Sequence, residues 1–307
     1  MDQDYSTFFS SVNLLNDRIE IKVNDIMTVE HLLDSAKDFK STNTFKDKYH
    51  GVDYWWKKYK FQQCTFYFIK PEDFTSYYKP RIILLQPTLE MRKKIFNILS
   101  FSKTLYWKLS QVEITLDFVF KNEDVSNYAD TIKRDLDNAT HIVWSRAASS
   151  FNYEETRYRV NSNIDDINKC SKPIRIYPKT VNGKEVLRFE LMLNNKAAAD
   201  MDLLFNLDAN SIFKYIRFYK NTFDARAFAS LTERLQKKGA DIVRFKKVTS
   251  NFANRTTYTI NEKIIKIKKL VKELLPEYKV AKSISNCLVE DTELTTFILN
   301  NLHIKGV

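Results

Sequence analysis

Residues 172–195 hold the clearest folding signal in the chain, a predicted β-hairpin with the sequence KPIRIYPKTVNGKEVLRFELMLNN. Residues 173–177 and 186–193 alternate apolar and polar side chains, and Asn182-Gly183 between them is the dipeptide that two-residue hairpin turns favour. Such a turn fixes the two strands next to each other. We therefore expect this hairpin to be a rigid platform within a sheet.

Alternation divides each hairpin strand into two faces, because residues two apart on a strand point the same way. The apolar faces carry Ile174 and Ile176 on the first strand and Phe189, Leu191 and Leu193 on the second. The opposite faces carry Arg175, Tyr177 and Lys179 on the first strand and Arg188, Glu190 and Met192 on the second. We expect the apolar faces to be buried and the polar faces to be open.

Residues 111–120, QVEITLDFVF, form a second predicted strand with the same alternation. Glu113 and Asp117 project from one face, about 13 Å apart along the strand at about 3.3 Å per residue. This pair alone would need a bend to hold one metal ion, but Glu190 on a neighbouring strand would complete a site with either acid. Alternatively, the acids are solvated residues on the polar face of an amphipathic strand.

The order of these motifs resembles rolling-circle replication initiators of the Rep_trans plasmid type and of the filamentous-phage gene II type. The motifs are Val112-Glu113-Ile114-Thr115-Leu116-Asp117, Val143-Trp144-Ser145-Arg146, Ile176-Tyr177-Pro178-Lys179 and Leu187-Arg188-Phe189-Glu190-Leu191. The resemblance covers residues 60–205. It rests on the ordered set, because each motif alone is short.

The resemblance implies a DNA nicking and joining endonuclease. Such initiators attack one phosphodiester with a tyrosine, keep the 5′ phosphate covalently attached, and free a 3′ hydroxyl for a polymerase. Carried over to this sequence, Tyr177 would be the nucleophile, with Lys179 and Arg188 as charge stabilisers. Tyr153 and Tyr158 are rival nucleophiles, although neither stands in a Tyr-x-Lys context.

The resemblance also implies a divalent metal, Mg²⁺ or Mn²⁺, held by Glu113, Asp117 and Glu190. Hard cations of this kind take oxygen ligands, which suits carboxylates. A phenol with a pKa near 10 is a poor nucleophile at neutral pH, so a nearby cation must stabilise the phenolate. The metal would further stabilise the charge that develops on the phosphate.

The overall charge favours a polyanionic partner. The chain has 307 residues, with 49 Lys and Arg against 38 Asp and Glu, for a formal net charge of +11. Nucleic acid is the simplest partner for such a balance. The resemblance implies origin DNA, single-stranded or as an extruded hairpin, together with a host helicase and polymerase. It leaves the oligomeric state open, a dimer included.

Aromatic and basic residues alternate in residues 51–61, as in proteins that stack single-stranded bases and attract phosphates. The alternative is a strand whose rings fill the core. A lysine-rich helical face is predicted in residues 261–275, where it would be either solvated or a phosphate-tracking surface. The nucleic-acid-binding candidates are Trp55, Trp56, Lys57, Lys58, Arg146, Arg175, Lys266 and Lys269.

The predicted fold is α+β, with a ferredoxin-like antiparallel sheet nuclease domain, helices on one of its faces, and a mostly helical C-terminal region. The expected parts are an accessory segment at 1–50, a nicking domain at 51–207 and a helical DNA-binding region at 208–307. The expected helices cover residues 89–99, 124–138, 197–207, 211–219, 224–238 and 261–275. Two further short helices are expected within 280–302.

Cysteine usage and hydropathy predict a cytoplasmic protein without a membrane partner. Cys64, Cys170 and Cys287 are far apart and odd in number, which argues against a disulfide framework or a zinc cluster. The N-terminal residues lack the pattern of a secretory signal, and no apolar stretch is long enough to span a bilayer.

The main alternative function is a non-catalytic basic nucleic-acid-binding protein, in which Tyr177 and Glu190 are structural. Isolated histidines argue against a His-ligated nuclease centre, and the scarcity of glycine argues against a fused P-loop helicase. A tyrosine recombinase is disfavoured, because the helical half lacks an arginine-histidine-arginine set with a late tyrosine.

Overall fold

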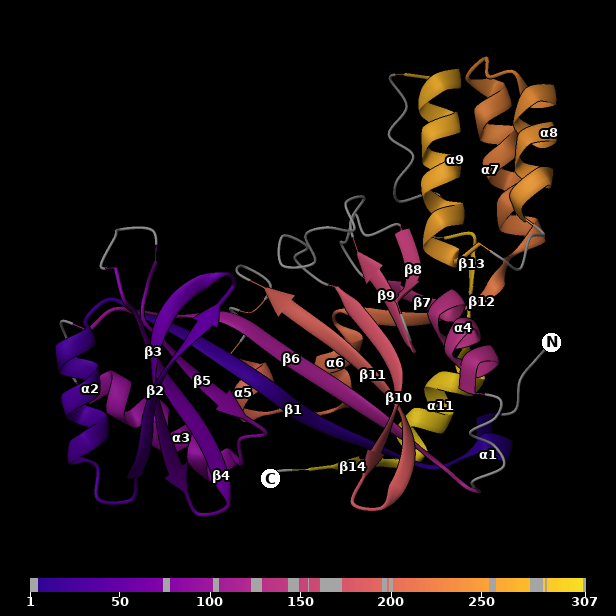
Figure 1. The fold of residues 1–307 in the computed structure, drawn as a ribbon. Helices are drawn as coiled ribbons and strands as arrows, with labels where there is room; N and C mark the ends of the chain where they lie inside the picture. The colour runs from indigo at the N-terminus through magenta and orange to yellow at the C-terminus, as the bar shows by residue number, and fades with distance from the viewer. Residues whose placement is uncertain are drawn as a thin grey trace. The chain divides into compact units, whose positions relative to one another are not determined.

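The protein has an α+β fold with a large antiparallel sheet (Figure 1). The computed structural model describes residues 5–73, 78–101, 105–122, 129–142, 149–153, 155–160, 173–194, 198, 201–253, 258–276, 284 and 286–305. Within these residues, no helix is both long enough and apolar enough to cross a membrane.

The chain forms two compact units that are discontinuous in sequence. Unit 1 comprises residues 1–12, 118–189 and 212–302, and unit 2 comprises residues 13–117, 190–211 and 303–307. The elements that begin in one unit and end in the other are β1 (Phe9–Val23), β6 (Trp107–Phe120), β11 (Lys184–Asn194), α6 (Ala209–Phe213) and β14 (Leu302–Ile304). The units therefore do not divide at the expected boundaries near residues 50 and 207.

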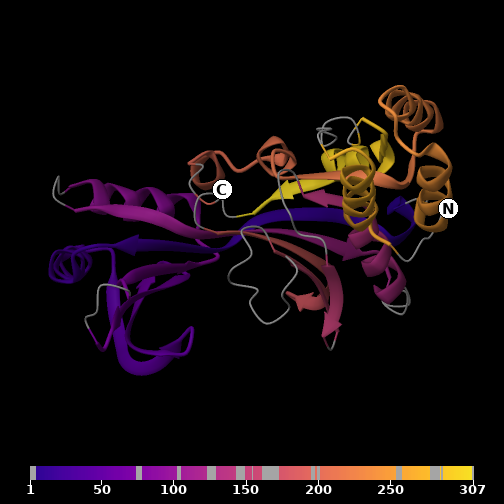
Figure 2. The same ribbon diagram turned by 90° about the horizontal axis from the view of Figure 1, so that it is seen from above.

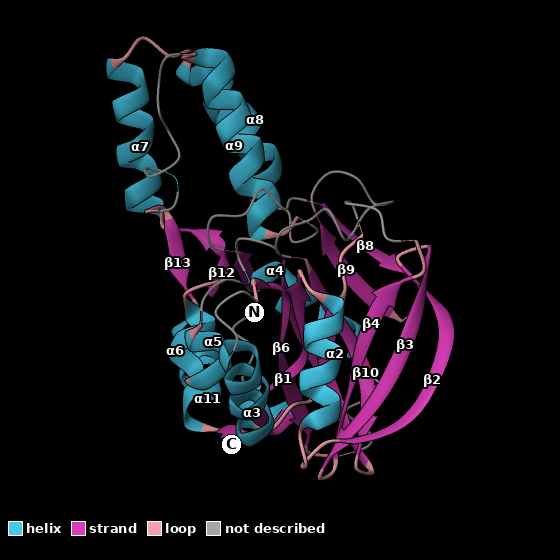
Figure 3. Ribbon diagram, turned by 90° about the vertical axis from the view of Figure 1, so that its left-hand side faces the viewer, coloured by secondary structure: helices cyan, strands magenta, loops and turns pink. Residues whose placement is uncertain are grey.

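Unit 2 consists mainly of strands that pair with their neighbours in sequence. Its remaining strands are β2 (Lys40–Tyr49), β3 (Val52–Phe61), β4 (Cys64–Pro71) and β5 (Arg81–Leu85), and its helices are α2 (Ile26–Ser35), α3 (Leu89–Phe101) and α5 (Asp202–Phe205). Strands β2 to β5 pair in antiparallel order, and β5 pairs with β1. Helices α2 and α3 lie side by side on one face of these strands (Figure 2, Figure 3).

The strands and helices of unit 2 follow from local signals that the sequence carries. Asp25 begins α2 by accepting a hydrogen bond from the backbone N–H of Thr28 at 3.1 Å. Thr88 begins α3 in the same way, accepting from the N–H of Met91 at 3.2 Å. Two short runs of mainly apolar residues form β4 and β5.

Unit 1 combines the end of the sheet with a group of helices. Its strands are β7 (Thr140–Ile142), β8 (Ser149–Tyr153), β9 (Thr156–Val160), β10 (Ile174–Val181), β12 (Ile216–Phe223) and β13 (Leu288–Glu290). Its helices are α1 (Tyr5–Phe8), α4 (Ala129–Ala139), α7 (Ala225–Lys237), α8 (Ile242–Ala253), α9 (Ile260–Leu274) and α11 (Thr292–Asn300).

Helices α7, α8 and α9 pack around a core of their own (Figure 1). The buried residues of this core include Leu231, Leu235, Phe245, Ile264 and Val271. Helix α7 begins at Asp224 and α9 begins with a reciprocal capping box, and both helices confirm the predicted ranges within one or two residues. These two helices can be predicted from the sequence because their capping residues are strong and their apolar stripes are regular.

The strand order is β2-β3-β4-β5-β1-β6-β11-β10-β9-β8, with β14 paired to β1, and a second sheet has the order β13-β12-β7. Strand β1 therefore lies inside the sheet, between β5 and β6, rather than in an accessory segment. The sequence reading missed this strand because β1 pairs with β5 residues 59 to 67 positions away, and local patterns do not report such pairing.

Two helix predictions in the C-terminal region are only partly confirmed. The helix expected at residues 211–219 ends with α6 at Phe213, and residues 216–223 form strand β12, which pairs with β7 through Ile216 and Ile142 and with β13 through Tyr219 and Glu290. Of the two short helices expected within 280–302, α11 is confirmed, residues 288–290 form β13, and residues 280–283 and 285 lie outside the described residues. In the 197–207 range, the described residues contain only the short helix α5, and in the 124–138 range the described part of α4 begins at Ala129.

Candidate functional site

The hairpin that carries Tyr177 forms as the sequence predicted. Strands β10 and β11 are joined at Asn182 and Gly183, which have φ of 51° and 75°. Both values lie in the left-handed region that type I′ turns require, and glycine and asparagine adopt it at low cost. Because the turn has two residues, a regular ladder between β10 and β11 would pair Val181 with Lys184 and place Arg188 opposite Tyr177.

The polar face of β10 is partly open. Ile174 and Ile176 are buried, whereas Arg175 and Tyr177 are half-buried and Lys179 is exposed. The phenol of Tyr177 is therefore on the solvent-accessible side of its strand. Lys179 lies two residues along the same face, close to the turn.

The polar faces of β6 and β11 are buried, and here the prediction of an open face is wrong. Glu113 and Asp117 on β6 are 5% and 2% exposed, and Arg188 and Glu190 on β11 are 1% and 2% exposed. Both strands lie in the interior of the strand order, with neighbours on each side. Alternation tells which residues share a face, but it does not tell whether neighbouring side chains cover that face.

The three predicted metal ligands have the right chemistry but do not form a recognisable site. Carboxylate oxygens suit Mg²⁺ and Mn²⁺. One oxygen of Glu113, however, accepts a 2.6 Å hydrogen bond from the side-chain amide of Gln111. Within the described parts of the chain, no cluster of three or more His, Cys, Asp or Glu side chains is placed to hold a metal ion. Glu113, Asp117 and Glu190 therefore do not fit a shared metal centre in this arrangement.

The aromatic and basic residues of β3 are divided between two opposite faces of the strand. Trp55 and Lys57 lie on the face that α2 covers, where the ammonium of Lys57 contacts Asp34 at 2.6 Å and Glu30 at 3.3 Å. Trp56 and Lys58 lie on the other face, because alternate residues of a strand point in opposite directions. Lys57 is thus an ion-paired residue of the helix-covered face, and it is less suited to nucleic acid than the sequence suggested.

The remaining candidates are scattered. On α9, Lys266 and Lys269 are exposed, and the Lys266 ammonium lies 4.6 Å from the centre of the Tyr258 ring. Arg146 lies outside the described residues, as does the Trp144-Ser145 motif. Tyr153 is on β8 and Tyr158 is on β9, where it pairs in register with Arg175.

A buried ionic cluster in unit 2 was missed at the sequence level. The carboxylate of Glu20 is 1% exposed, and it accepts a 2.5 Å hydrogen bond from the hydroxyl of Tyr49. The guanidinium groups of Arg18 and Arg81 lie 2.6 Å and 3.2 Å from it. Arg81 also donates to the hydroxyl of Ser110 at 3.2 Å. The alternation of charged and apolar residues from Arg18 to Val23 was the available signal.

This cluster alters the protonation behaviour of its members. Burial, and then the charge of Glu20, raise the pKa of the Tyr49 hydroxyl well above its ordinary value. Burial lowers the pKa of Arg18, but the charges of Glu20 and Glu113 outweigh it and leave that pKa raised. Both shifts follow from placing a carboxylate where water cannot screen it.

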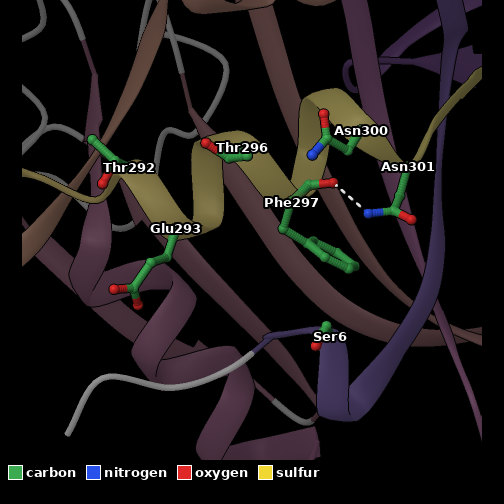
Figure 4. A pocket seen from close by; sticks show the side chains of 7 residues that line it. All are labelled: Ser6, Thr292, Glu293, Thr296, Phe297, Asn300 and Asn301. Carbon is green, nitrogen blue, oxygen red and sulfur yellow. Dashed lines mark hydrogen bonds between the residues drawn. The ribbon is translucent and has the colours of Figure 1, made fainter.

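A shallow surface depression lies apart from all the predicted site residues (Figure 4). Its lining residues are Ser6, Thr292, Glu293, Thr296, Phe297, Asn300 and Asn301. They come from α1, from the whole length of α11 and from the residue that follows it. The side-chain amide of Asn301 donates to the carbonyl of Phe297 at 2.9 Å, so it is used to end the helix. The depression has one carboxylate and no cationic side chain in its lining.

Comparisons with known proteins add no assignment to this geometry. No protein-family model matches the chain, and no curated protein matches it.

Proposed function

We propose that this chain is a replication initiator of the rolling-circle type, which nicks and joins single-stranded DNA at an origin. The observation that carries the proposal is the hairpin position of Tyr177, on an accessible strand face with the buried guanidinium of Arg188 on the paired strand. A cation beside a phenol favours its deprotonated, nucleophilic form. Lys179, on the same strand, adds a second positive charge.

The reaction is a phosphoryl transfer to tyrosine. The oxygen of Tyr177 attacks the phosphorus, the bond from phosphorus to the 3′ oxygen of the preceding nucleotide breaks, and that oxygen takes up a proton. The products are a 5′-phosphotyrosine and a free 3′ hydroxyl, and the reverse step rejoins the strand. Arg188 and Lys179 would stabilise the negative charge that grows on the phosphate oxygens.

Mg²⁺ or Mn²⁺ remains the proposed cofactor, and Glu113, Asp117 and Glu190 remain its candidate ligands. Because these three side chains do not fit a shared centre in this arrangement, no step of the reaction is assigned to the metal. The strand order supports their relevance, since β10 pairs with β11 and β11 pairs with β6. The ferredoxin-like plan and a C-terminal DNA-binding region at 208–307 belong to the same proposal.

Adduct formation tests the proposal directly. The full chain would be incubated with Mn²⁺ or Mg²⁺ and labelled single-stranded oligonucleotides that include sequences of its own replicon, then resolved on a denaturing gel. We expect a covalent protein-DNA adduct that Tyr177→Phe abolishes. Tyr106→Phe is the matched control, because Tyr106 is exposed and lies at the start of β6 rather than in the hairpin.

The outcomes separate the possible nucleophiles and the role of metal. An adduct that persists in Tyr177→Phe and disappears in Tyr153→Phe or Tyr158→Phe would move the nucleophile to one of those residues. An adduct that forms in EDTA would remove the metal from the proposal. Absence of any adduct with origin-bearing DNA would reject nicking.

A non-catalytic nucleic-acid-binding protein is the second candidate function. It is favoured by the burial of all three predicted metal ligands, since buried carboxylates in a sheet interior commonly have a structural role. In that case binding would be salt-sensitive, and Tyr177→Phe would leave it unchanged.

A further inference from the structure

One face of the unit 2 sheet carries a packed group of aromatic rings. Phe45 pairs in register with Trp56, so their side chains lie on the same face of the sheet. Their rings are stacked, with centroids 6.0 Å apart and an angle of 13° between planes. Tyr67 meets Trp56 edge-on at 5.4 Å and Phe45 edge-on at 6.4 Å. We call Phe45, Trp56 and Tyr67 the aromatic triad.

The triad is held in place before any ligand arrives. The indole N–H of Trp56 donates to the backbone carbonyl of Asp47 at 3.2 Å, which fixes the ring across strands β2 and β3. Trp56 also packs against a buried cluster that includes Tyr49, Tyr54 and Ile69. Phe45 itself is 39% exposed and stands on β2, the first strand in the sheet order. A rigid ring on an exposed strand loses little entropy when another ring stacks on it.

Three lysines share this face. Lys58 pairs in register with Tyr67, and Lys40 pairs with Lys60, which lies two residues beyond Lys58 on β3. Alternation therefore places all three on the side of the aromatic triad. Among the described residues, none of the three forms a salt bridge. The salt bridges of these strands are made by Lys46, Lys57 and Lys70.

The opposite face of the same strands carries more ion pairs. There Lys57 and Lys70 share Glu30 of α2, and Lys46 pairs with Glu72 at 2.5 Å. On that face Lys48 is the lysine without a salt bridge among the described residues, whereas the face of the aromatic triad has three such lysines beside its rings. Asp47, an exposed acid on the triad face, accepts a hydrogen bond from the backbone N–H of Lys48.

We infer that the face of the aromatic triad, with Lys40, Lys58 and Lys60, binds a segment of single-stranded DNA. A base would stack on the exposed ring of Phe45, and the lysines would contact the adjoining phosphates. Bases in a duplex present only their edges, so stacking of this kind selects the unpaired strand. The identification of that strand as origin DNA rests on the proposed function, and the surface deepens it by adding a binding site on unit 2.

Binding of a fluorescent oligothymidylate to the full-length chain tests this inference. The measurement uses a Tyr177→Phe background in EDTA, so that affinity is read without any covalent chemistry. We expect Phe45→Ala to weaken binding about tenfold, the loss typical of one stacked base. Phe101→Ala is the matched control, because Phe101 is 83% exposed at the end of α3, away from the face of the aromatic triad, and should leave the affinity within about twofold.

A second variant covers the phosphate contacts and does not touch the core. Lys58→Gln with Lys60→Gln should lower the slope of log affinity against log salt by about 1.4, at about 0.7 per phosphate on a single strand. Lys46→Gln on the opposite face should leave the slope unchanged.

The outcomes distinguish this inference from the proposed nicking activity. Weaker binding in Phe45→Ala and in the lysine variant supports the surface, whether or not an adduct forms with the wild-type chain. Unchanged affinity in both variants overturns it, even if Tyr177 forms an adduct. Equal or tighter binding of the matching duplex, or of oligouridylate, would also overturn it, because the site would then not be specific for unpaired DNA.

Discussion

Two buried charges, one in each unit, have different surroundings, and the contrast shows how surroundings set the protonation of a buried group. In unit 2, Glu20 is surrounded by Arg18, Arg81 and the hydroxyl of Tyr49. In unit 1, the ammonium of Lys263 is equally buried, at 1% exposure, and it donates to the carbonyl of Asn221 at 2.9 Å.

The two groups differ in how their surroundings affect protonation. Burial alone would lower the pKa of Arg18, but the charges of Glu20 and Glu113 leave it raised. For Lys263, burial lowers the pKa to about 8. A buried charge with opposite charges around it thus becomes part of the fold, whereas the charge of Lys263 becomes dependent on pH.

The largest expected effect is on the Glu20 cluster. Glu20→Gln should lower the free energy of unfolding by about 3 kcal/mol, because it leaves two arginines facing each other without their shared carboxylate. Denaturant unfolding of the full chain measures this change. Glu72→Gln is the control and should cost far less, since its partner Lys46 is exposed and water screens the pair. Equal costs for the two variants would contradict the contrast between buried and exposed pairs.

The next effect is a pH dependence carried by Lys263. Its pKa is about 8 in the folded protein and about 10.5 in the unfolded chain, so the unfolded chain holds more protons between these values. Stability contributed by this group should therefore rise from pH 8 to pH 10.5, by up to about 3 kcal/mol. Lys263→Met should remove that rise in unfolding curves taken across the range. The exposed Lys269→Met should retain it.

The smallest effect concerns a single partner of Glu20. Tyr49→Phe removes one hydrogen bond but leaves both arginines in place, so it should cost about 1 to 2 kcal/mol. The same denaturant titration compares it with Glu20→Gln. A loss as large as that of Glu20→Gln would mean that the hydroxyl, and not the charge balance, holds the cluster together.

The sequence predicts those parts of the fold that depend on a few neighbouring residues. The hairpin turn needs only Asn182 and Gly183, and helices α7 and α9 need only their caps and a regular stripe. The candidate site was readable in part. The sequence placed Tyr177 on an open strand face, but it also predicted that Glu113 and Glu190 would be open, and they are buried.

The sequence by itself determined the turn, the helix ends and which residues share a strand face, because each depends on a few consecutive residues. Only the tertiary structure decided which polar faces are covered and which charges are paired. Trp55 and Trp56 are adjacent in sequence, yet one lies on the side of α2 and the other joins the aromatic triad. The physical reason is that burial and ion pairing depend on strands and helices far away in the chain, which alternation does not identify.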